Sequence, residues 1–239
     1  MVVFERQQII IKYLKEKRFA TVKEISSVVF ASEASVRRDV KALEAKGLLK
    51  QIYGGVVLPE YENSVVPVSL RDSSNSAVKD ELARRAADEL FDGATVILDG
   101  SSTVRRIIKY IDKYRDIRII TNNARLFGEN IPSGVKLYCT GGLYISQSGI
   151  FVGSGAESYI SGINADILFF SSQALSDDGE ISDVSEEETS LRRVMLSRAT
   201  RKIFLADSSK LGDRRTFSVC TKDDVDRIIC DKELPFEMG

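Results

Sequence analysis

The sequence contains no histidine, and only three cysteines and four prolines occur among its 239 residues. The lack of histidine excludes catalysis by an imidazole and removes the commonest metal ligand. Cys139, Cys220 and Cys230 lie far apart and form no C-x-x-C pair, so we expect buried thiols in a reducing cytoplasm and no metal or other cofactor. No apolar run approaches the roughly 20 residues that span a bilayer, and the charged N-terminus lacks the pattern of a signal peptide.

The net charge of −1 conceals an asymmetry along the chain. Residues 1–58 carry 11 lysines and arginines against 6 acidic residues, whereas the remainder carries 23 against 29. The chain is long enough for two domains, and 43% of its residues are hydrophobic, enough for a substantial core. A small basic end on an acidic body is typical of a nucleic-acid-binding domain joined to a second domain.

The stretch from Ser32 to Gly47 predicts one helix with a marked start and end. Ser32 is a favourable N-cap, and Gly47 suits the left-handed residue at which many helices stop. Three apolar residues recur at helical spacing and face a core: Val36, Val40 and Leu43. Polar residues lie mostly off that stripe: Ser35, Arg37, Arg38 and Lys41. They suit a helix in the DNA major groove, but a solvated surface with ordinary charges explains this stretch alone equally well.

The neighbouring segments complete a larger motif. Residues 4–17 predict a first helix, and Thr21 begins a second, with Glu24 three residues later as in a capping box. After the third helix, two short apolar strands flank Gly54-Gly55, which suits a hairpin turn with positive φ. Three helices and a hairpin predict a winged helix-turn-helix. Its wing places three residues against the phosphate backbone: Lys50, Gln51 and Tyr53.

Residues 59–76 are polar, contain two of the four prolines, and predict an extended linker between domains of residues 1–58 and 77–239. In the second domain, apolar strands alternate with helices, which predicts an α/β domain with a mainly parallel sheet. Strands are expected at residues 94–99, 117–121, 135–140, 165–170 and 202–206, with short ones near 216–220 and 227–230. Helices are expected at residues 77–90, 104–114 and 185–200.

Five of these strands end in small or polar residues, and ligands bind at the carboxyl ends of strands in open α/β sheets. The loop after the first strand also opens a helix, whose free N–H groups favour phosphate. Lys79, Arg192 or Lys210 supplies the countercharge. A phosphorylated sugar or polyol fits such a pocket best, although ordinary turns use the same residue types. The candidate effector contacts at these strand ends are Asp99, Gly100, Ser101, Ser102, Thr103, Thr121, Asn122, Asn123, Gly141, Gly142 and Asp207.

About fifty N-terminal residues follow a specific pattern in register: Glu5-Arg6, Ile10, Leu14, Val22, Glu24-Ile25, Ser32, Ser35-Val36-Arg37-Arg38-Asp39-Val40, Leu43-Glu44, Gly47 and Tyr53-Gly54-Gly55. With these residues the domain resembles the DNA-binding domain of the DeoR family of bacterial transcriptional regulators. The resemblance implies DNA contacts from four residues: Ser32, Ser35, Arg37 and Arg38. Alternatively, one of the two arginines bonds Asp39 or Glu44. The family usually has Arg at the position of Gln51.

The second domain carries further matches: Thr121-Asn122-Asn123, Gly141-Gly142, Leu191-Arg192-Arg193-Val194-Met195 and Ala206-Asp207-Ser208-Ser209-Lys210. Residues 71–231 thus resemble the DeoR-type effector domain, which is similar to ribose-5-phosphate isomerase and sugar-phosphate deaminase folds. Arg71 and Lys79 resemble a pair that opens this domain. The sequence departs from the family in two places. Residues 99–103 stand where the family has Asp-Ser-Gly-Thr-Thr, and Ser171-Ser172 replaces a turn that contains glycine.

These patterns predict a DNA-binding regulator that represses carbohydrate catabolic genes until a phosphorylated sugar releases it from its operator. Repression is implied by the resemblance alone. We expect a homo-oligomer, either a dimer or a tetramer, because palindromic sites mirror two-fold symmetry. One alternative is a sugar-phosphate isomerase with Asp99 or Asp207 as the base, although a winged helix has no use in such an enzyme. The other is a DNA-binding module whose second domain only assembles copies of the chain.

Overall fold

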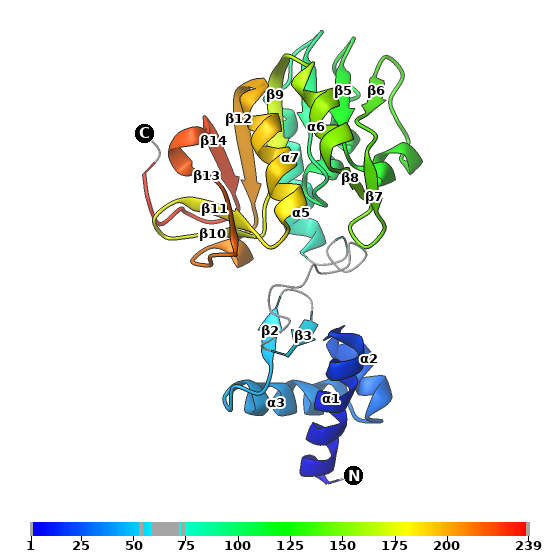
Figure 1. The fold of residues 1–239 in the computed structure, drawn as a ribbon, viewed down its shortest axis with the longest axis vertical. Coiled ribbons are helices and arrows are strands. Elements are labelled where there is room, and N and C mark those ends of the chain that lie inside the picture. Colours follow the sequence, from blue (N-terminus) through cyan, green and yellow to red (C-terminus); the bar gives the residue numbers. More distant parts are fainter. Residues whose placement is uncertain (1, 53–54, 59–71, 73–74, 238–239) are drawn as a thin grey trace. The chain divides into compact units, whose positions relative to one another are not determined.

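The computed structural model describes residues 2–52, 55–58, 72 and 75–237 (Figure 1). The chain divides into two compact units, residues 1–66 and 67–239, and each has its own hydrophobic core. No helix among the described residues is long and apolar enough to cross a membrane.

The first unit packs three helices against a small antiparallel sheet. The helices are α1 (Val3–Lys17), α2 (Val22–Val28) and α3 (Glu33–Glu44). The strands β1 (Phe19–Ala20), β2 (Lys50–Ile52) and β3 (Gly55–Val57) form a sheet in the order β1-β3-β2. The predicted winged helix-turn-helix is therefore confirmed. Its core draws on every helix: Ile10, Leu14, Ile25, Val36, Val40 and Leu43.

The capping residues set the helix boundaries of this unit. Thr21 and Glu24 form the predicted capping box of α2, and the Ser32 hydroxyl accepts the Ser35 N–H at the start of α3. The last helical residue of α3 is Glu44, and Gly47 follows with φ +69°. The N–H of Leu48 then donates to the Leu43 carbonyl at 3.0 Å, which satisfies one of the free carbonyls at the helix end.

Gly55 corrects the predicted turn. The β2–β3 register pairs Ile52 with Gly55, so Gly55 belongs to a strand and not to a two-residue turn with positive φ. A Cβ atom at Gly55 would lie 2.3 Å from the ring of Phe19 and 2.6 Å from the carbonyl oxygen of Ala20. Glycine is therefore required because β1 approaches closely at this point. Tyr53 and Gly54 lie outside the described residues.

The second unit is built on a six-stranded parallel sheet in the order β14-β12-β9-β4-β5-β6. The strands are β4 (Thr95–Leu98), β5 (Arg118–Thr121), β6 (Lys136–Cys139), β9 (Ala165–Phe170), β12 (Ala199–Ala206) and β14 (Arg227–Cys230). This order is that of a doubly wound sheet. The direction of winding reverses between β4 and β9, and a crevice for ligands forms at such a switch point.

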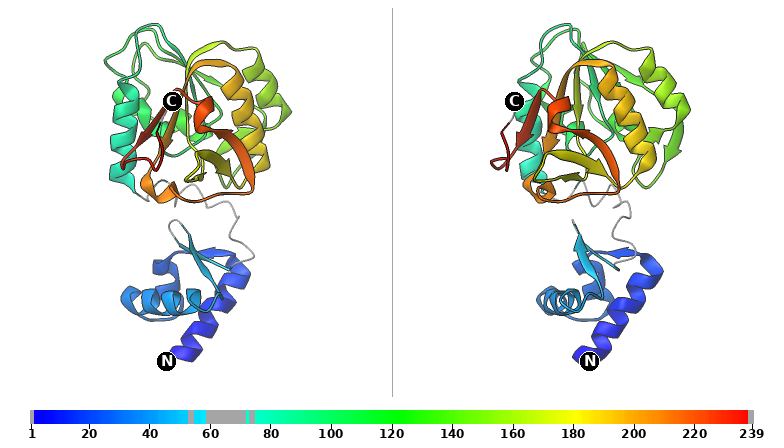
Figure 2. Two further views of the ribbon diagram at one scale, coloured as in Figure 1. Left: turned by 90° about the vertical axis from the view of Figure 1, so that its left-hand side faces the viewer. Right: turned by 60° about the vertical axis from the view of Figure 1, so that its left-hand side comes forward.

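Helical segments cover both faces of the sheet (Figure 2). On one face lie α5 (Ser76–Ala87) and the 3₁₀ helix η2 (Val104–Tyr110), which pack on alternate sheet residues such as Val96 and Leu98. On the other face lie α6 (Ser154–Ser161) and α7 (Glu186–Ser197), which pack on the intervening residues such as Ile97. The predicted α/β domain with a parallel sheet is confirmed.

Several smaller elements differ from the prediction. The helix expected at residues 104–114 is the shorter η2. The region between β6 and β9 contains the unpredicted α6 and an antiparallel hairpin, β7 (Leu143–Ile145) and β8 (Ile150–Val152). The strand expected near 216–220 is β13 (Phe217–Thr221), but it belongs to a separate sheet with β10 (Ala174–Leu175) and β11 (Glu180–Asp183). Further 3₁₀ helices are η3 (Ala124–Gly128), η4 (Ser208–Lys210) and η5 (Lys222–Asp224).

Candidate DNA interface and effector site

The surface of α3 carries the predicted DNA contacts. Ser32, Arg37, Arg38 and Lys41 are exposed, and Ser35 is half-buried. The Arg37 guanidinium lies 3.4 Å from the Glu33 carboxylate, and Arg38 makes equally long bonds to the Ala34 carbonyl and the Ser35 hydroxyl. Surface contacts of this length contribute little stability. Both arginines are therefore held only loosely on the solvent side of α3.

Neither arginine bonds Asp39 or Glu44, because other residues occupy these carboxylates. Arg6 of α1 donates to both carboxylate oxygens of the buried Asp39, one bond measuring 3.1 Å. Glu44 accepts the backbone N–H of Gln51 at 2.8 Å and the Gln51 side-chain amide at 2.5 Å. A bidentate ion pair thus fixes α3 to α1, and a pair of hydrogen bonds fixes the end of α3 to β2.

The wing presents Lys50 and Gln51 on the exposed surface of β2. The bonds to Glu44 tie down the Gln51 side chain, and Lys50 is the charged residue of β2. The third predicted wing contact, Tyr53, lies outside the described residues. The basic residues of α3 and β2 give the first unit the surface chemistry that phosphate backbones attract.

The loops after β4 and β9 meet at the switch point through Asp99. One carboxylate oxygen of this buried residue accepts the Ser101 N–H at 3.0 Å, and the other accepts the Ser171 N–H at 3.3 Å. Gly100 explains the shifted glycine of residues 99–103. A Cβ at Gly100 would lie 2.5 Å from the Ile150 side chain, so the family's Ser does not fit at this position without movement of Ile150.

The loops after β5 and β6 are held by internal contacts. Asn123 donates from its side chain to the Gly100 carbonyl at 3.1 Å and from its N–H to the Thr121 hydroxyl at 3.0 Å. Asn122 donates to the Phe151 carbonyl at 2.9 Å. Gly141 and Gly142 have φ values of +64° and +108°. These candidates therefore shape the loops, and their predicted effector contacts stay predictions.

Arg192 of α7 lies in an acidic surrounding and not in a cationic pocket. Its guanidinium donates to Asp99 at 3.0 Å, to Asp183 at 2.9 Å and to Glu188 at 2.8 Å, and all four side chains are buried. Burial lowers the pKa of Arg192, but the three carboxylates outweigh it and raise the pKa above its ordinary value. We call these four residues the acidic cluster. Three carboxylates around one guanidinium repel phosphate, so this surrounding does not favour the predicted effector contact of Arg192, which stays a prediction.

Lys79 of α5 and two residues that follow β12, Asp207 and Lys210, form a second group, which we call the cationic cluster. Lys79 is only 2% exposed. Burial lowers its pKa to about 8, and the charge of the nearby Lys210 adds to this effect. Lys210 donates to the Ser171 hydroxyl at 2.8 Å. Burial alone would raise the pKa of Asp207, but Lys210 and other partners hold it below its usual value.

The structure thus brings together three of the predicted effector residues, Lys79, Asp207 and Lys210. Two of their neighbours were not among the predicted effector residues. Asn75, within the expected linker, donates to Asp207 at 3.3 Å, and Ser171 joins the cationic cluster to Asp99. The position of Ser171 at a strand end was the available signal. Ser101, Ser102 and Thr103 are buried in the adjacent loop, and Arg71 lies outside the described residues.

Both units of the chain match known domain families. Residues 6–62 match the DeoR-like helix-turn-helix domain, and residues 74–232 match the DeoR C terminal sensor domain. The HTH-type transcriptional repressor GlcR of Bacillus subtilis is 29% identical over 95% of this chain and 88% of its own length. The L-fucose operon activator of Haemophilus influenzae is 28% identical over 96% of this chain and 92% of its own length.

Among solved structures, ribose 5-phosphate isomerase from Plasmodium falciparum aligns with 61% of this chain and 54% of its own length, with 21% identity and a TM-score of 0.38. The two family matches cover most of the chain, and the relatives named above regulate transcription. The chain is therefore a DNA-binding transcriptional regulator and belongs to the DeoR family.

Proposed function

We propose that this regulator is a repressor of carbohydrate catabolic genes and that a singly phosphorylated sugar or polyol releases it from its operator. The observation that carries this proposal is the cationic cluster of Lys79, Lys210 and Asp207 beside the switch point. A buried ammonium with a lowered pKa gains stability when an anion enters beside it. A phosphate group is an anion that two lysines suit well.

Groups around the cationic cluster offer further contacts to the proposed effector. The cluster lies at the N-terminal turn of the 12-residue helix α5, where the helix dipole favours an anion. Asp207 and Asn75 offer polar atoms beside the lysines, and one carboxylate oxygen of Asp207 is buried without a hydrogen-bond partner among the described residues. Such an acceptor fits a sugar hydroxyl.

The DNA contacts are proposed from the exposed side of α3 and from the wing. Arg38 is the candidate for base readout, since an arginine near the start of a recognition helix can bond guanine with two N–H groups. Lys50 is the candidate phosphate contact from β2. The proposed contacts of α3 are Ser32, Ser35, Arg37, Arg38 and Lys41.

Release from the operator requires that the effector bind the DNA-competent state of the regulator less tightly than the state that does not bind DNA. One relative is named a repressor and another an activator. We propose the repressor sign for this chain. Catalysis by Asp99 does not fit the site, because two backbone N–H groups and Arg192 already occupy its carboxylate oxygens.

Thermal unfolding with a panel of ligands tests the sugar-phosphate proposal. The panel contains monophosphates of pentoses, hexoses and polyols, their unphosphorylated parents and the corresponding bisphosphates. A ligand at 100 times its Kd adds about 2.7 kcal/mol of stability, which corresponds to several degrees for a chain of this size. We expect one monophosphate to raise the midpoint and then to weaken binding to the operator.

Two variants serve as a matched pair in this experiment. Lys210→Ala should lose most of the shift because it removes a cation from the cluster. Lys113→Ala removes an exposed lysine that pairs with Asp88 and should keep the shift. A flat panel for the folded wild type contradicts the sugar-phosphate proposal. A ligand that strengthens operator binding contradicts release from DNA.

A further inference from the structure

One segment of the sensor unit is almost without charge. Residues 137–165 contain a single charged residue, Glu157, whereas charged residues make up 29% of the whole chain. The Glu157 carboxylate accepts the Ser190 hydroxyl of α7 at 2.7 Å, so its hydrogen-bonding capacity is partly used within the unit. This segment therefore supplies almost no charge to the surface of the sensor unit.

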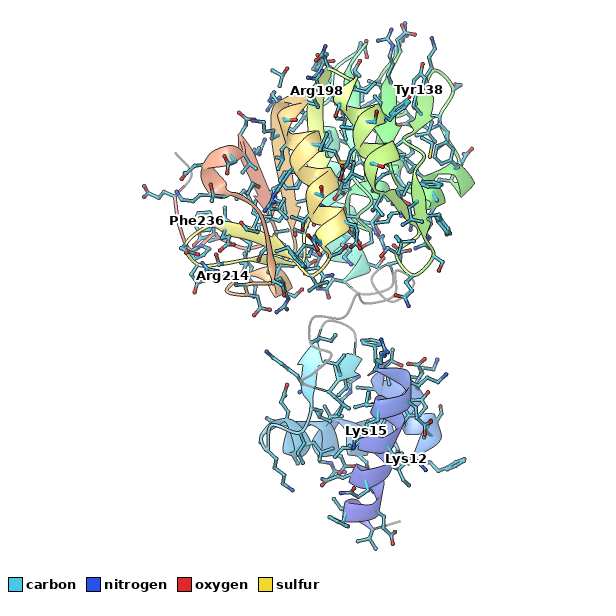
Figure 3. The ribbon with its side chains drawn as sticks, viewed as in Figure 1. Lys12, Lys15, Tyr138, Arg198, Arg214 and Phe236 are labelled. Atoms are coloured by element: carbon cyan, nitrogen blue, oxygen red, sulfur yellow. The ribbon has the colours of Figure 1, made fainter. Side chains whose placement is uncertain are left out.

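The same segment exposes four large side chains from β6, β7 and α6, which we call the uncharged face: Tyr138, Leu143, Tyr144 and Tyr159. Leu143 is 63% exposed, and the Tyr144 ring packs on Phe151 with centroids 5.4 Å apart. Gly142, just before β7, approaches the backbone of Ala156 in α6, which places hairpin and helix together. Tyr138 is seen on β6 at the border of the sheet (Figure 3). Depletion of charge with enrichment of tyrosine is the composition of interface cores.

The two edges of the six-stranded sheet differ in their protection. At the β14 edge, Glu89 pairs with Arg201 and Arg227, and Arg85 donates to the Cys230 carbonyl at 2.7 Å. Such charges keep other strands away from an edge. At the opposite edge, β6 pairs with β5, and no second strand is bonded to it among the described residues. Tyr138 of this strand, a member of the uncharged face, is 40% exposed.

We propose that the uncharged face binds the same face of a second copy of this chain across a two-fold axis. A surface without charge needs a partner without charge, because an unpaired charge loses its hydration in the contact. The same face of a second copy meets this requirement, because each copy carries the same residues 137–165. A two-fold contact places each patch on its own equivalent. It also sets the two β6 edges side by side, where their free backbone groups can pair.

Sedimentation velocity of the full chain at tens of micromolar tests this contact. We expect the wild type to contain an even number of copies, and Leu143→Glu to halve the mass. Phe91→Glu is the matched control, because Phe91 is also about half exposed but lies between α5 and β4, outside the face. It should keep the wild-type mass. Tyr159→Glu on α6 is a second test variant, so the result does not depend on the folding of one substitution.

Circular dichroism confirms that each variant is folded before its mass is compared. A monomeric wild type overturns the proposal, and so do folded Leu143→Glu and Tyr159→Glu variants with the wild-type mass. Equal loss of mass in the Phe91→Glu control also overturns it. The uncharged face shares no residue with the cationic cluster. These outcomes are therefore separate from those of the ligand panel.

Discussion

At the scale of single residues, Lys79 is the most informative side chain of the sensor unit. It is buried beside Lys210 and Arg106, and burial and these like charges lower its pKa to about 8. Asp207 compensates only in part. The pKa of Lys79 in the folded chain lies below the ordinary lysine value. Between pH 8 and about 10.5 the unfolded chain therefore binds more protons than the folded chain, and the free energy of unfolding rises with pH. An anionic ligand beside Lys79 raises its pKa again, because the anion favours the charged form of the lysine.

Effector affinity should therefore fall above pH 8. Between pH 7 and pH 9 we expect a loss of about tenfold, since at pH 9 only about one free protein in ten still carries the Lys79 proton. Calorimetry in buffers of different ionisation enthalpy should show proton uptake on binding at pH 9. Lys79→Arg keeps the charge at both pH values and should flatten the profile. An equal loss in Lys79→Arg contradicts a role for the Lys79 proton.

The sequence indicated some site residues better than others. Lys79, Asp207 and Lys210 are recognisable because each stands at a predicted helix start or strand end. Arg192 occupies a similar position on a predicted helix, yet its partners Asp99 and Asp183 come from other elements. Long-range partners of this kind leave no local pattern. The surroundings of a charged residue are set by the tertiary fold, so its role could not be read from its type.

At the scale of elements, the turn between α2 and α3 stores local strain. Phe30 has φ +47° and is 91% exposed. The left-handed conformation costs a residue with a Cβ about 1–2 kcal/mol, and asparagine tolerates it better. The exposed ring contributes little packing in return. The turn nevertheless fixes the angle at which α3 follows α2.

Phe30→Asn should stabilise the DNA-binding unit by about 1 kcal/mol, because it relieves the strain without adding the flexibility of glycine. Native-state hydrogen exchange of the slowest amides in α3 measures the change. Phe4→Asn is the control, since Phe4 is also exposed but lies within α1. Protection of α3 that is unchanged or reduced in Phe30→Asn contradicts the strain.

Elements with strong local signals were predicted well. The N-caps Thr21 and Ser32 placed α2 and α3, and the apolar run of residues 165–170 placed β9 to the residue. The hairpin β7–β8 and helix α6 were missed because this segment is rich in glycine and serine and has no clear period. The turn around Gly55 was misplaced because the need for glycine there comes from Phe19 of another strand.

At the scale of the whole molecule, charge is divided between the two units. The basic excess belongs to the first unit, and the acidic excess to the remainder. Binding to DNA therefore draws on a local field of one unit, and its affinity should fall steeply with salt as condensed ions are released from the duplex.

Lys50→Ala and Arg38→Ala should separate the two kinds of DNA contact. Loss of a phosphate contact at Lys50 should weaken operator and unrelated DNA alike and reduce the salt slope by about 1. Loss of base readout at Arg38 should cost about 1–3 kcal/mol on the operator and less on unrelated DNA. Titrations of both DNAs over a range of salt give both quantities. Equal weakening of the two DNAs by Arg38→Ala contradicts base readout.

The order of the strands is the property of the whole fold that the sequence left open. Alternation of strands and helices predicted a parallel sheet whose polar loops share one edge. It did not show that β4 lies beside β9, because neighbours in a sheet are chosen by the crossovers and not by the strands themselves. That adjacency brings Asp99 to Ser171, and so joins the acidic cluster to the cationic cluster.

On the proposed function, the acidic cluster limits the number of phosphate groups that an effector can carry. Its three carboxylates share a single guanidinium, and one of them, Asp99, is joined to the lysine end of the site through Ser171. On the proposed function, a sugar that carries one phosphate places it at the lysines, away from the acidic cluster. A second phosphate at the other end of the sugar meets two unbalanced negative charges. We therefore expect this regulator to distinguish the substrate of a sugar-phosphate kinase from its product.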